Sequence, residues 1–453
     1  MKTVVRPEEA VNSSTIPPGS RIYSAGNAAT PQVLLKQIAK DRDIRDVELL
    51  GTLLLGEIDA LFCKECCERV THRVIFNSAH SRVAVNNSWA MYQLMHLSDI
   101  PRQLRRHIKP NVALISVSGP DKGGNYSLGT TVEAVLAAVE TVKVNGGVVI
   151  AERNARMPFI LGTTITKEAI DYLIDSDYEL PTNPCSTPDD RARKIGELIA
   201  QLYIHDGCTL QYGIGEVPGA VTDAVLKKGV KDLGIHTELF ATALRKLVDA
   251  GIVNNKYSGA NFSIATLFLA ENEREYEWYD YNSCVQSRPC DVTNNILNIV
   301  SEPRMVAINS AIGVDLHGNI WADSLHVNEI YSGIGGQSDF LRGAYLSRHG
   351  VPIIALKATT NKGETKILSK CPEGVSSTAI AADPIVIVTE YGAFDPRGLS
   401  ICEHAIGIAH LAEPGVRDEL LKYIFDSEKF HRPRQALSDK RPKGFFPYED
   451  LGN

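Results

Sequence analysis

The sequence predicts an α/β protein made of two related open-sheet domains, the first over residues 1–185 and the second over residues 186–453. Three observations support this. Apolar runs alternate with helical patterns, as in folds with buried, largely parallel strands. The 453 residues exceed what one hydrophobic core usually supports. One motif also recurs in both halves with identical internal spacing: Val112-Ala113, Asp121 and Gly124-Asn125 match Val306-Ala307, Asp315 and Gly318-Asn319.

Short apolar runs bounded by turn residues are predicted as strands at Val112–Ser118, Gly147–Ala151, Thr209–Tyr212, Met305–Ile308, Pro352–Leu356 and Ile385–Thr389. Apolar residues at helical spacing predict a helix over Thr130–Lys143. A proline-rich segment over residues 179–190 marks the domain boundary. A helix is predicted after it, with Thr187 as cap, Pro188 as first residue and Asp206-Gly207 as its end. Because ligands bind beyond the carboxyl ends of parallel strands, we expect the chemistry at the strand-to-loop junctions.

A looser repeat supports the duplication. Gly26, Pro31 and Glu48 occur in the same order as Gly215, Pro218 and Glu238. Two repeats in the same order favour two related halves over chance.

Composition excludes several functional classes. The formal net charge of −7 lacks the positive field of a dedicated nucleic-acid binder. We find no apolar stretch of signal-peptide or membrane-spanning length, so we expect a cytoplasmic protein with no membrane partner. Nine cysteines, an odd number over a long chain, indicate reduced thiols. Cys63, Cys66 and Cys67 lack a second ligand pair, so we interpret them as buried or incidental thiols and expect no metal site.

The segment TLQYGIGEVPGA, residues 209–220, is the first candidate for ligand binding. Gly213 and Gly215 would allow a ligand close to the backbone, and a helix opening at Pro218 would favour an anion such as a pyrophosphate or carboxylate. The alternative is a tight strand–helix turn. A dinucleotide fingerprint is not matched, because Pro218 and Gly219 break its spacing.

Glu238, in the apolar segment LGIHTELF, is the candidate nucleophile. Flanking Leu239 and Phe240 would desolvate its carboxylate, which raises the pKa and increases nucleophilicity. The alternative is a capping or strand-end glutamate. His236 either orients this segment or packs in the core, and we give it no catalytic role.

The glycine-dense segment YSGIGGQSDFLRG, residues 331–343, is the third candidate. Gly333, Gly335 and Gly336 could present N–H donors to an oxyanion or to the arm of a bulky ligand; the alternative is a flexible turn.

Further along the chain, Ser400 to Glu403 predicts a capping box, which makes Glu403 structural. Glu390, Asp395 and Arg397 remain possible network residues. The basic residues of segment 101–110 predict a solvated helix face, with a phosphate or partner contact as the alternative.

Taken together, seven segments resemble the acetyl-CoA hydrolase/transferase family of class I CoA-transferases. Two lie in the first half, VAVNNS and SGPDKGGNYSLG, and five in the second half, GIGEVPGAV, LGIHTEL, MVAINSAIGVDLHGN, SGIGGQSDFLRGA and VTEYGAFDPRGLS. The similarity is greatest to the 4-hydroxybutyrate or butyryl-CoA:acetate type. The resemblance implies a ping-pong CoA-transferase that uses CoA as substrate and needs no metal, nucleotide or redox cofactor. It implies that Glu238 forms a glutamyl-CoA thioester, and it favours a homo-oligomer. It implies CoA contacts at Gly213, Ile214, Gly215, Glu216, Val217, Gly313, Gly335 and Gly336.

Departures from the family pattern leave the acid substrate open. Many relatives have Met-Phe-Ser-Asp-Gly where this chain has Leu239 to Ala243, so the acyl-CoA could carry an acetyl, butyryl, 4-hydroxybutyryl or succinyl group, and the acid could be itaconate. If water is the acceptor, the same glutamate gives an acyl-CoA hydrolase. A non-catalytic α/β metabolite-binding or nucleotide-binding module is the third alternative.

Overall fold

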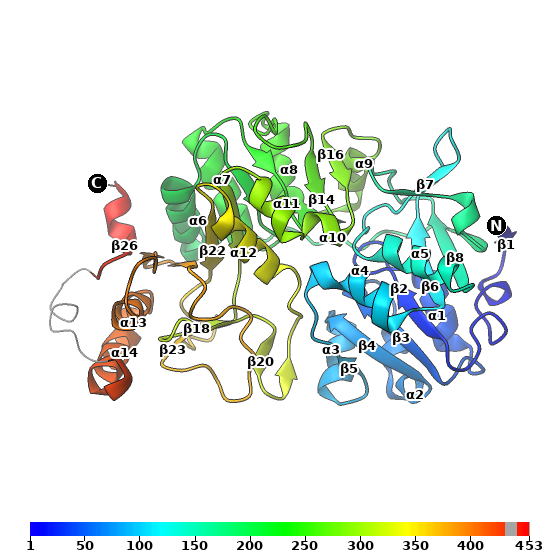
Figure 1. The fold of residues 1–453 in the computed structure, drawn as a ribbon, viewed down its shortest axis with the longest axis horizontal. Coiled ribbons are helices and arrows are strands. Elements are labelled where there is room, and N and C mark those ends of the chain that lie inside the picture. Colours follow the sequence, from blue (N-terminus) through cyan, green and yellow to red (C-terminus); the bar gives the residue numbers. More distant parts are fainter. Residues whose placement is uncertain (431–441, 453) are drawn as a thin grey trace.

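The computed structural model describes residues 1–430 and 442–452, and each half of the chain is built around one large sheet (Figure 1). The first sheet has eight strands in the order β1-β10-β8-β6-β2-β3-β4-β5, and every neighbouring pair is parallel. Their bounds in that order are Lys2–Val4, Tyr172–Ser176, Val148–Asn154, Val112–Val117, Arg21–Ser24, Val47–Thr52, Val70–Phe76 and Met91–Tyr92.

The second sheet has seven strands in the order β12-β11-β17-β22-β24-β25-β26. The first five are parallel, and β25 and β26 are added antiparallel at one edge. Their bounds in that order are Gly234–Ile235, Thr209–Gln211, Met305–Asn309, Val351–Ala355, Val386–Thr389, Gly392–Phe394 and Phe445–Pro447. All six predicted strands are therefore confirmed, within two or three residues at their ends.

The two sheets share one connectivity, which confirms the duplication. The order β3-β2-β6-β8-β10 in the first corresponds to β12-β11-β17-β22-β24 in the second. The repeated motif forms the same turn twice: Asp121 Oδ1 accepts from the Asn125 N–H at 2.8 Å, and Asp315 Oδ1 accepts from the Asn319 N–H at 2.9 Å.

The looser repeat holds only in part, because its two glutamates are not equivalent. Glu48 lies within β3, whereas Glu238 lies beyond the end of the two-residue strand β12.

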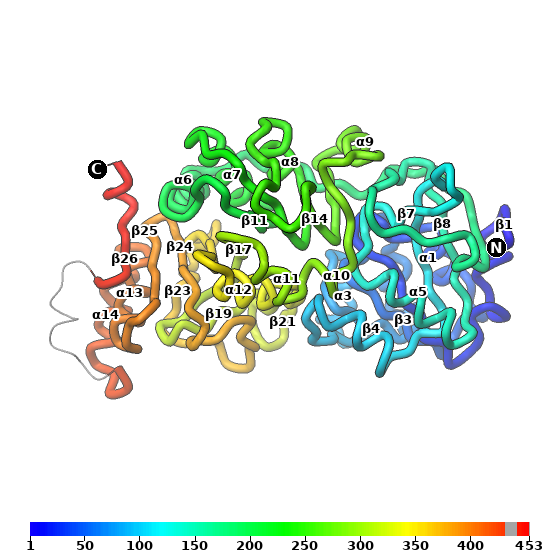
Figure 2. The backbone as a smooth tube through the Cα atoms, turned by 45° about the horizontal axis from the view of Figure 1, so that its top comes forward, coloured from blue at the N-terminus to red at the C-terminus, as the bar shows by residue number. Residues whose placement is uncertain are grey.

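Helices cover both faces of each sheet, so each half has three layers (Figure 2). In the first half, α1 (Gln32–Lys40) and α3 (Ala79–Asn86) pack on one face and α5 (Val135–Val144) on the other. In the second half, α6 (Asp190–Tyr203), α7 (Glu216–Lys228) and α8 (Thr242–Asp249) pack on one face. On the opposite face lie α11 (Ile296–Ser301), α12 (Gln337–Leu346), α13 (Ile401–His410) and α14 (Pro414–Asp426).

Three predicted helix starts are wrong. Helix α6 begins at Asp190 because Asp189, a strong cap residue, accepts from the Ala192 N–H at 2.8 Å; Thr187 and Pro188 precede it. Helix α7 begins at Glu216, two residues before Pro218, after Gly215 at φ 116°. Helix α5 begins at Val135 because Thr131 and Val132 pair with residues 266–268 of the second half and a turn at Glu133 follows.

The remaining sequence features are mostly structural. Cys66 is buried within α2 (Lys64–Cys67), and burial raises its pKa to about 11. The basic segment forms α4 (Ile100–Gln103) and a π-helical turn at Leu104–Ile108, and Arg105 pairs with Glu140 and with Asp291 of the second half. The Ser400–Glu403 capping box of α13 is confirmed. Among the described helices, we find none with the length and apolar character needed to span a bilayer.

The predicted domain boundary between residues 185 and 186 falls in the segment that joins the two sheets, since β10 ends at Ser176 and β11 begins at Thr209.

Candidate active site

Glu238 lies in the loop between β12 and the short strand β13 (Leu239–Ala241), which pairs in parallel with β15 (Leu267–Leu269). Its carbonyl oxygen accepts from the backbone N–H groups of Thr266 at 3.1 Å and Leu267 at 3.0 Å. The main chain at Glu238 is thereby fixed, and its side chain is half-buried.

The Glu238 carboxylate faces Asn294 and the glycine loop. Asn294 Nδ2 donates to Oε2 at 2.8 Å, and the Gly336 backbone N–H also faces the carboxylate. A Cβ atom at Gly336 would overlap both Glu238 and Asn294, so only glycine fits there. Gly335, at φ 59°, is also close, since a Cβ built on it would lie 3.6 Å from Glu238 Oε1.

Burial raises the pKa of Glu238 from 4.5 to about 7. The Asn294 and Gly336 donors oppose this by stabilising the ionised form, whereas the negative charges of Asp339 and Glu133 add to it. The group is thus an ionisable carboxylate with reduced hydration and two fixed donors beside it. A carboxylate in such an environment is suited to act as a nucleophile, and the two donors are suited to stabilise a developing oxyanion.

The glycine loop is held by groups from the first half of the chain. The Leu97 N–H donates to the Gly335 carbonyl at 3.0 Å, the Asn77 N–H to the Ser332 carbonyl at 3.2 Å, and Arg82 Nε to the Tyr331 carbonyl at 2.8 Å. The nucleophile candidate therefore lies where the two halves meet, and its alignment depends on their contact.

A buried group of polar side chains lies behind this junction. Glu133 is 1% exposed, at φ 36°, and accepts from the Tyr23 hydroxyl at 2.9 Å. The Cys290 N–H, at the start of α10 (Cys290–Thr293), donates to the Glu133 carbonyl. Burial raises the pKa of Glu133 from 4.5 to about 7, and the hydrogen bond from the Tyr23 hydroxyl opposes this rise.

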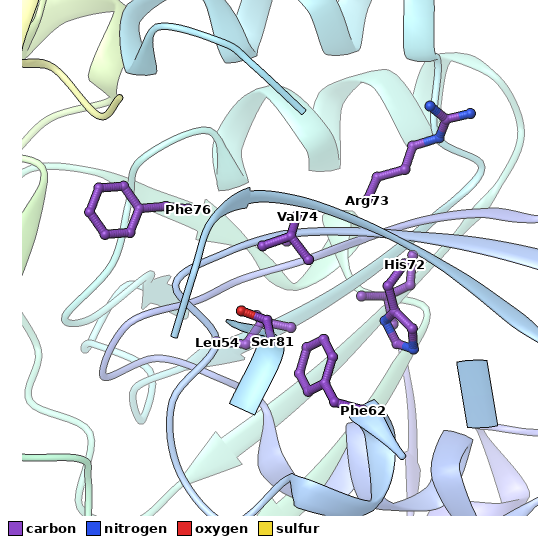
Figure 3. A pocket seen from close by; sticks show the side chains of 9 residues that line it. Leu54, Phe62, His72, Arg73, Val74, Phe76 and Ser81 are labelled. Atoms are coloured by element: carbon purple, nitrogen blue, oxygen red, sulfur yellow. The ribbon is translucent and has the colours of Figure 1, made fainter. Parts of the chain in front are cut away.

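Figure 3 shows a neighbouring pocket of the first half, with Phe76 at one end and His72 at the other. A Cβ at Gly335 would lie 3.5 Å from the Phe76 ring, so this pocket adjoins the glycine loop. His72 packs against Phe62 with ring centroids 4.8 Å apart, and burial lowers its pKa to about 4, which leaves the imidazole neutral.

Gly213, Ile214 and Gly215 of the predicted CoA loop line a second pocket, whereas Glu216 and Val217 do not. Ala241, Thr242 and Lys246, which follow Glu238 in the chain, line the same pocket. A Cβ at Gly213 or Gly215 would meet no atom within 4 Å, so the space above this loop is open. Ile214 is 43% exposed, and Glu216 pairs with Lys357. CoA contacts at these residues remain a prediction.

Gly313 has a packing role, because a Cβ there would overlap the Trp321 ring. Glu390 accepts from the Ala358 N–H at 2.8 Å, and Asp395 pairs with Arg397. The Glu390 contact holds a loop at the carboxyl edge of the second sheet, whereas Asp395 and Arg397 follow the antiparallel strand β25 and lie at the opposite edge. A CoA contact at Gly313 stays a prediction.

His236 is buried and orients the segment that carries Asn294. Its Nε2 lies 2.7 Å from the Thr293 carbonyl oxygen, and its Nδ1 lies 3.4 Å from Glu302 Oε1. Sequence reasoning missed Asn294, Glu133 and Phe76, since none lies in a recognisable motif. Across the described residues, no group of three or more His, Cys, Asp and Glu side chains is arranged to hold a metal ion.

Comparisons with known proteins agree with this arrangement. Residues 1–183 match the acetyl-CoA hydrolase/transferase N-terminal domain, and residues 272–424 match its C-terminal domain. The chain is 34% identical to a 4-hydroxybutyrate coenzyme A transferase of Clostridium kluyveri, over 92% of this chain and 96% of that protein. It is 30% identical to a butyryl-CoA:acetate CoA-transferase of Anaerostipes caccae, over 88% and 90%.

An acetyl-CoA hydrolase of Yarrowia lipolytica is 29% identical over 56% of this chain and 49% of that protein. The crystal structure of RipA from Yersinia pestis superposes with a TM-score of 0.86 at 29% identity, covering 93% of this chain and 96% of that one. The chain therefore belongs to the acetyl-CoA hydrolase/transferase family.

Proposed function

We propose that this chain is a CoA-transferase that moves CoA from a short-chain acyl-CoA to a carboxylic acid through a covalent glutamyl-CoA thioester on Glu238. The observation that carries the proposal is the Glu238 carboxylate, partly desolvated and facing Asn294 Nδ2 at 2.8 Å and the Gly336 N–H. Family membership supports the reaction class, because relatives include named CoA-transferases.

The reaction exchanges one activated carbonyl for another. A Glu238 carboxylate oxygen attacks the thioester carbon, the C–S bond breaks, and CoA leaves as a thiolate, which gives a mixed anhydride. The thiolate then attacks the Glu238 carbonyl carbon. The bond from that carbon to the bridging oxygen breaks, and the first carboxylate leaves. An incoming carboxylate reverses both steps, and no proton transfer is required.

This chain's residues supply charge stabilisation and alignment. The Asn294 amide and the Gly336 N–H can donate to the oxygen that becomes negative in each tetrahedral intermediate. The rigid main chain at Glu238 holds the carboxylate in place. A bound CoA ester would cover the half-buried side chain and keep water from the activated glutamate.

Trapping the thioester tests the proposal. The chain is incubated with acetyl-CoA, treated with borohydride, digested and analysed by mass spectrometry. We expect reduction of the thioester at Glu238, and loss of exchange in Glu238→Ala but not in Glu140→Gln, which changes an exposed glutamate. Full exchange in a folded Glu238→Ala variant contradicts the proposal. Parallel lines in double-reciprocal plots of initial rates test the ping-pong order.

Two further assays define the acceptor. Measuring the release of free thiol with and without added carboxylate separates transfer from hydrolysis. Hydrolysis is tested because relatives of this chain include a named acetyl-CoA hydrolase. A panel of acetate, butyrate, 4-hydroxybutyrate, succinate and itaconate identifies the acid.

A further inference from the structure

Strands β11 and β17 form the topological switch point of the second sheet. The strand that follows β11, which is β12, lies on one side of it, whereas β17, β22 and β24 extend to the other side. In open parallel sheets the crevice for a ligand opens at the carboxyl ends of the two strands at this point. Here those strands end at Gln211 and Asn309.

The two terminal residues form a hydrogen-bonded amide pair. Asn309 Nδ2 donates to Gln211 Oε1 at 3.2 Å. Within the described chain, the two N–H groups of Gln211 Nε2 and the Asn309 Oδ1 atom have no hydrogen-bond partner, and neither atom is sealed from solvent. Gln211 is only 5% exposed. The pair therefore leaves donors and an acceptor free in a little-exposed place, where an unmatched polar group is costly unless a ligand or water satisfies it.

The pair lies between the two glycine segments. Gly213 follows Gln211 by two residues and precedes the start of α7. On the other side, Gln337 Nε2 donates to the Ser310 carbonyl at 2.7 Å, which ties the residue after Gly336 to the residue after Asn309. The pair therefore adjoins both the glycine segment before α7 and the glycine loop that faces Glu238.

We propose that Gln211 and Asn309 form a binding site for an amide group of the pantetheine arm of CoA, a role that rests on the proposed transferase function. In this site Gln211 Nε2 donates to the amide carbonyl oxygen, and Asn309 Oδ1 accepts from the amide N–H. One planar secondary amide needs one donor and one acceptor side by side, and the pair offers both. Binding energy from this remote contact would position the thioester carbonyl at Glu238.

The test compares thioesters that differ in their amides. Gln211→Met and Asn309→Leu remove hydrogen bonding at similar size, and Gln201→Met changes an exposed glutamine of α6 as the matched control. The substrates are acetyl-CoA, acetyl-pantetheine and an acetyl thioester of an alkyl thiol without amides. We expect kcat/KM for the first two to fall about 10–100-fold in both variants, from the loss of one or two hydrogen bonds. The rate with the alkyl thioester should change less than about twofold.

Equal losses with all three thioesters would show a structural role and overturn the inference, as would unchanged rates with all three. If Gln211→Met does not fold, Gln211→Glu keeps the shape but exchanges donors for acceptors, and the same selective loss is expected. Calorimetric binding of CoA separates this inference from the proposed function. Weaker CoA binding in the amide variants supports the site even if Glu238→Ala proves fully active, and unaltered CoA binding refutes it.

Discussion

Replacing Glu133 by glutamine should make the stability of the first half less dependent on pH. In the folded chain burial raises the pKa of this carboxyl from 4.5 to about 7, so the folded state holds its proton more tightly than the unfolded state. The associated stability is fully present below about pH 4.5 and is lost as the pH rises through 7. The difference between the two pKa values corresponds to about 3 kcal/mol.

The glutamine side chain keeps the size and can still accept from the Tyr23 hydroxyl, so the variant removes only the ionisation. Scanning calorimetry between pH 5 and pH 8.5 measures the result. The variant and the natural chain should melt together near pH 5, and the variant should melt about 6–12 °C higher at pH 8.5, from about 2–4 °C per kcal/mol for a domain of this size. Glu140→Gln, on the exposed side of α5, should show no such divergence. A difference in melting temperature that stays constant over this pH range would refute the reasoning.

The same substitution should shift the acid limb of kcat/KM to lower pH, because the charge of Glu133 raises the pKa of Glu238 and ionised Glu238 is the proposed nucleophile. A pH–rate profile checks this, and an unmoved limb contradicts it. Asn294→Ala removes a donor that lowers this pKa, so the limb should move to higher pH and kcat should fall about 10–100-fold, measured by steady-state exchange. Gly336→Ala should abolish exchange by overlap with Glu238, whereas Gly213→Ala, which meets no protein atom, should fold normally and mainly raise KM for acyl-CoA. Asp315→Ala should cost about 3 kcal/mol, because its buried carboxylate accepts from four N–H groups. The matching Asp121→Ala, in a turn that solvent reaches, should cost less, and urea unfolding compares the two variants.

Local sequence signals predicted the elements that depend on local physics. Buried parallel strands appear as short apolar runs, so strands such as β6 and β17 are readable within a residue or two. The helix over Thr130–Lys143 was predicted too long because Thr131 pairs with Leu267 of the other half. A residue at helical spacing can thus be held extended by a strand that lies far away in the sequence.

The residues of the candidate site also fall into those with a local sequence signal and those without one. Glu238 is readable from its apolar neighbours, and Gly335 and Gly336 from their density in one loop. Asn294, 56 residues from Glu238, and Phe76, from the other half, reach the site only through the folded chain. Neither carries a local signal, because an asparagine in a short helix–helix turn and a phenylalanine at a strand end are both ordinary structural residues.

The two halves differ at corresponding positions, the topological switch points between β2 and β6 in the first sheet and between β11 and β17 in the second. In the second half the start of α7 follows an open glycine loop, and its N–H groups are available to an anion. In the first half the start of the corresponding helix α1 is occupied, because the buried carboxylate of Glu152 accepts from the N–H groups of Val33 at 3.0 Å and Leu34 at 3.4 Å. An internal carboxylate in that place excludes a ligand anion by charge and by volume. The first copy of the fold therefore supports the glycine loop and the buried group behind Glu238, while the second copy carries Glu238, the proposed nucleophile.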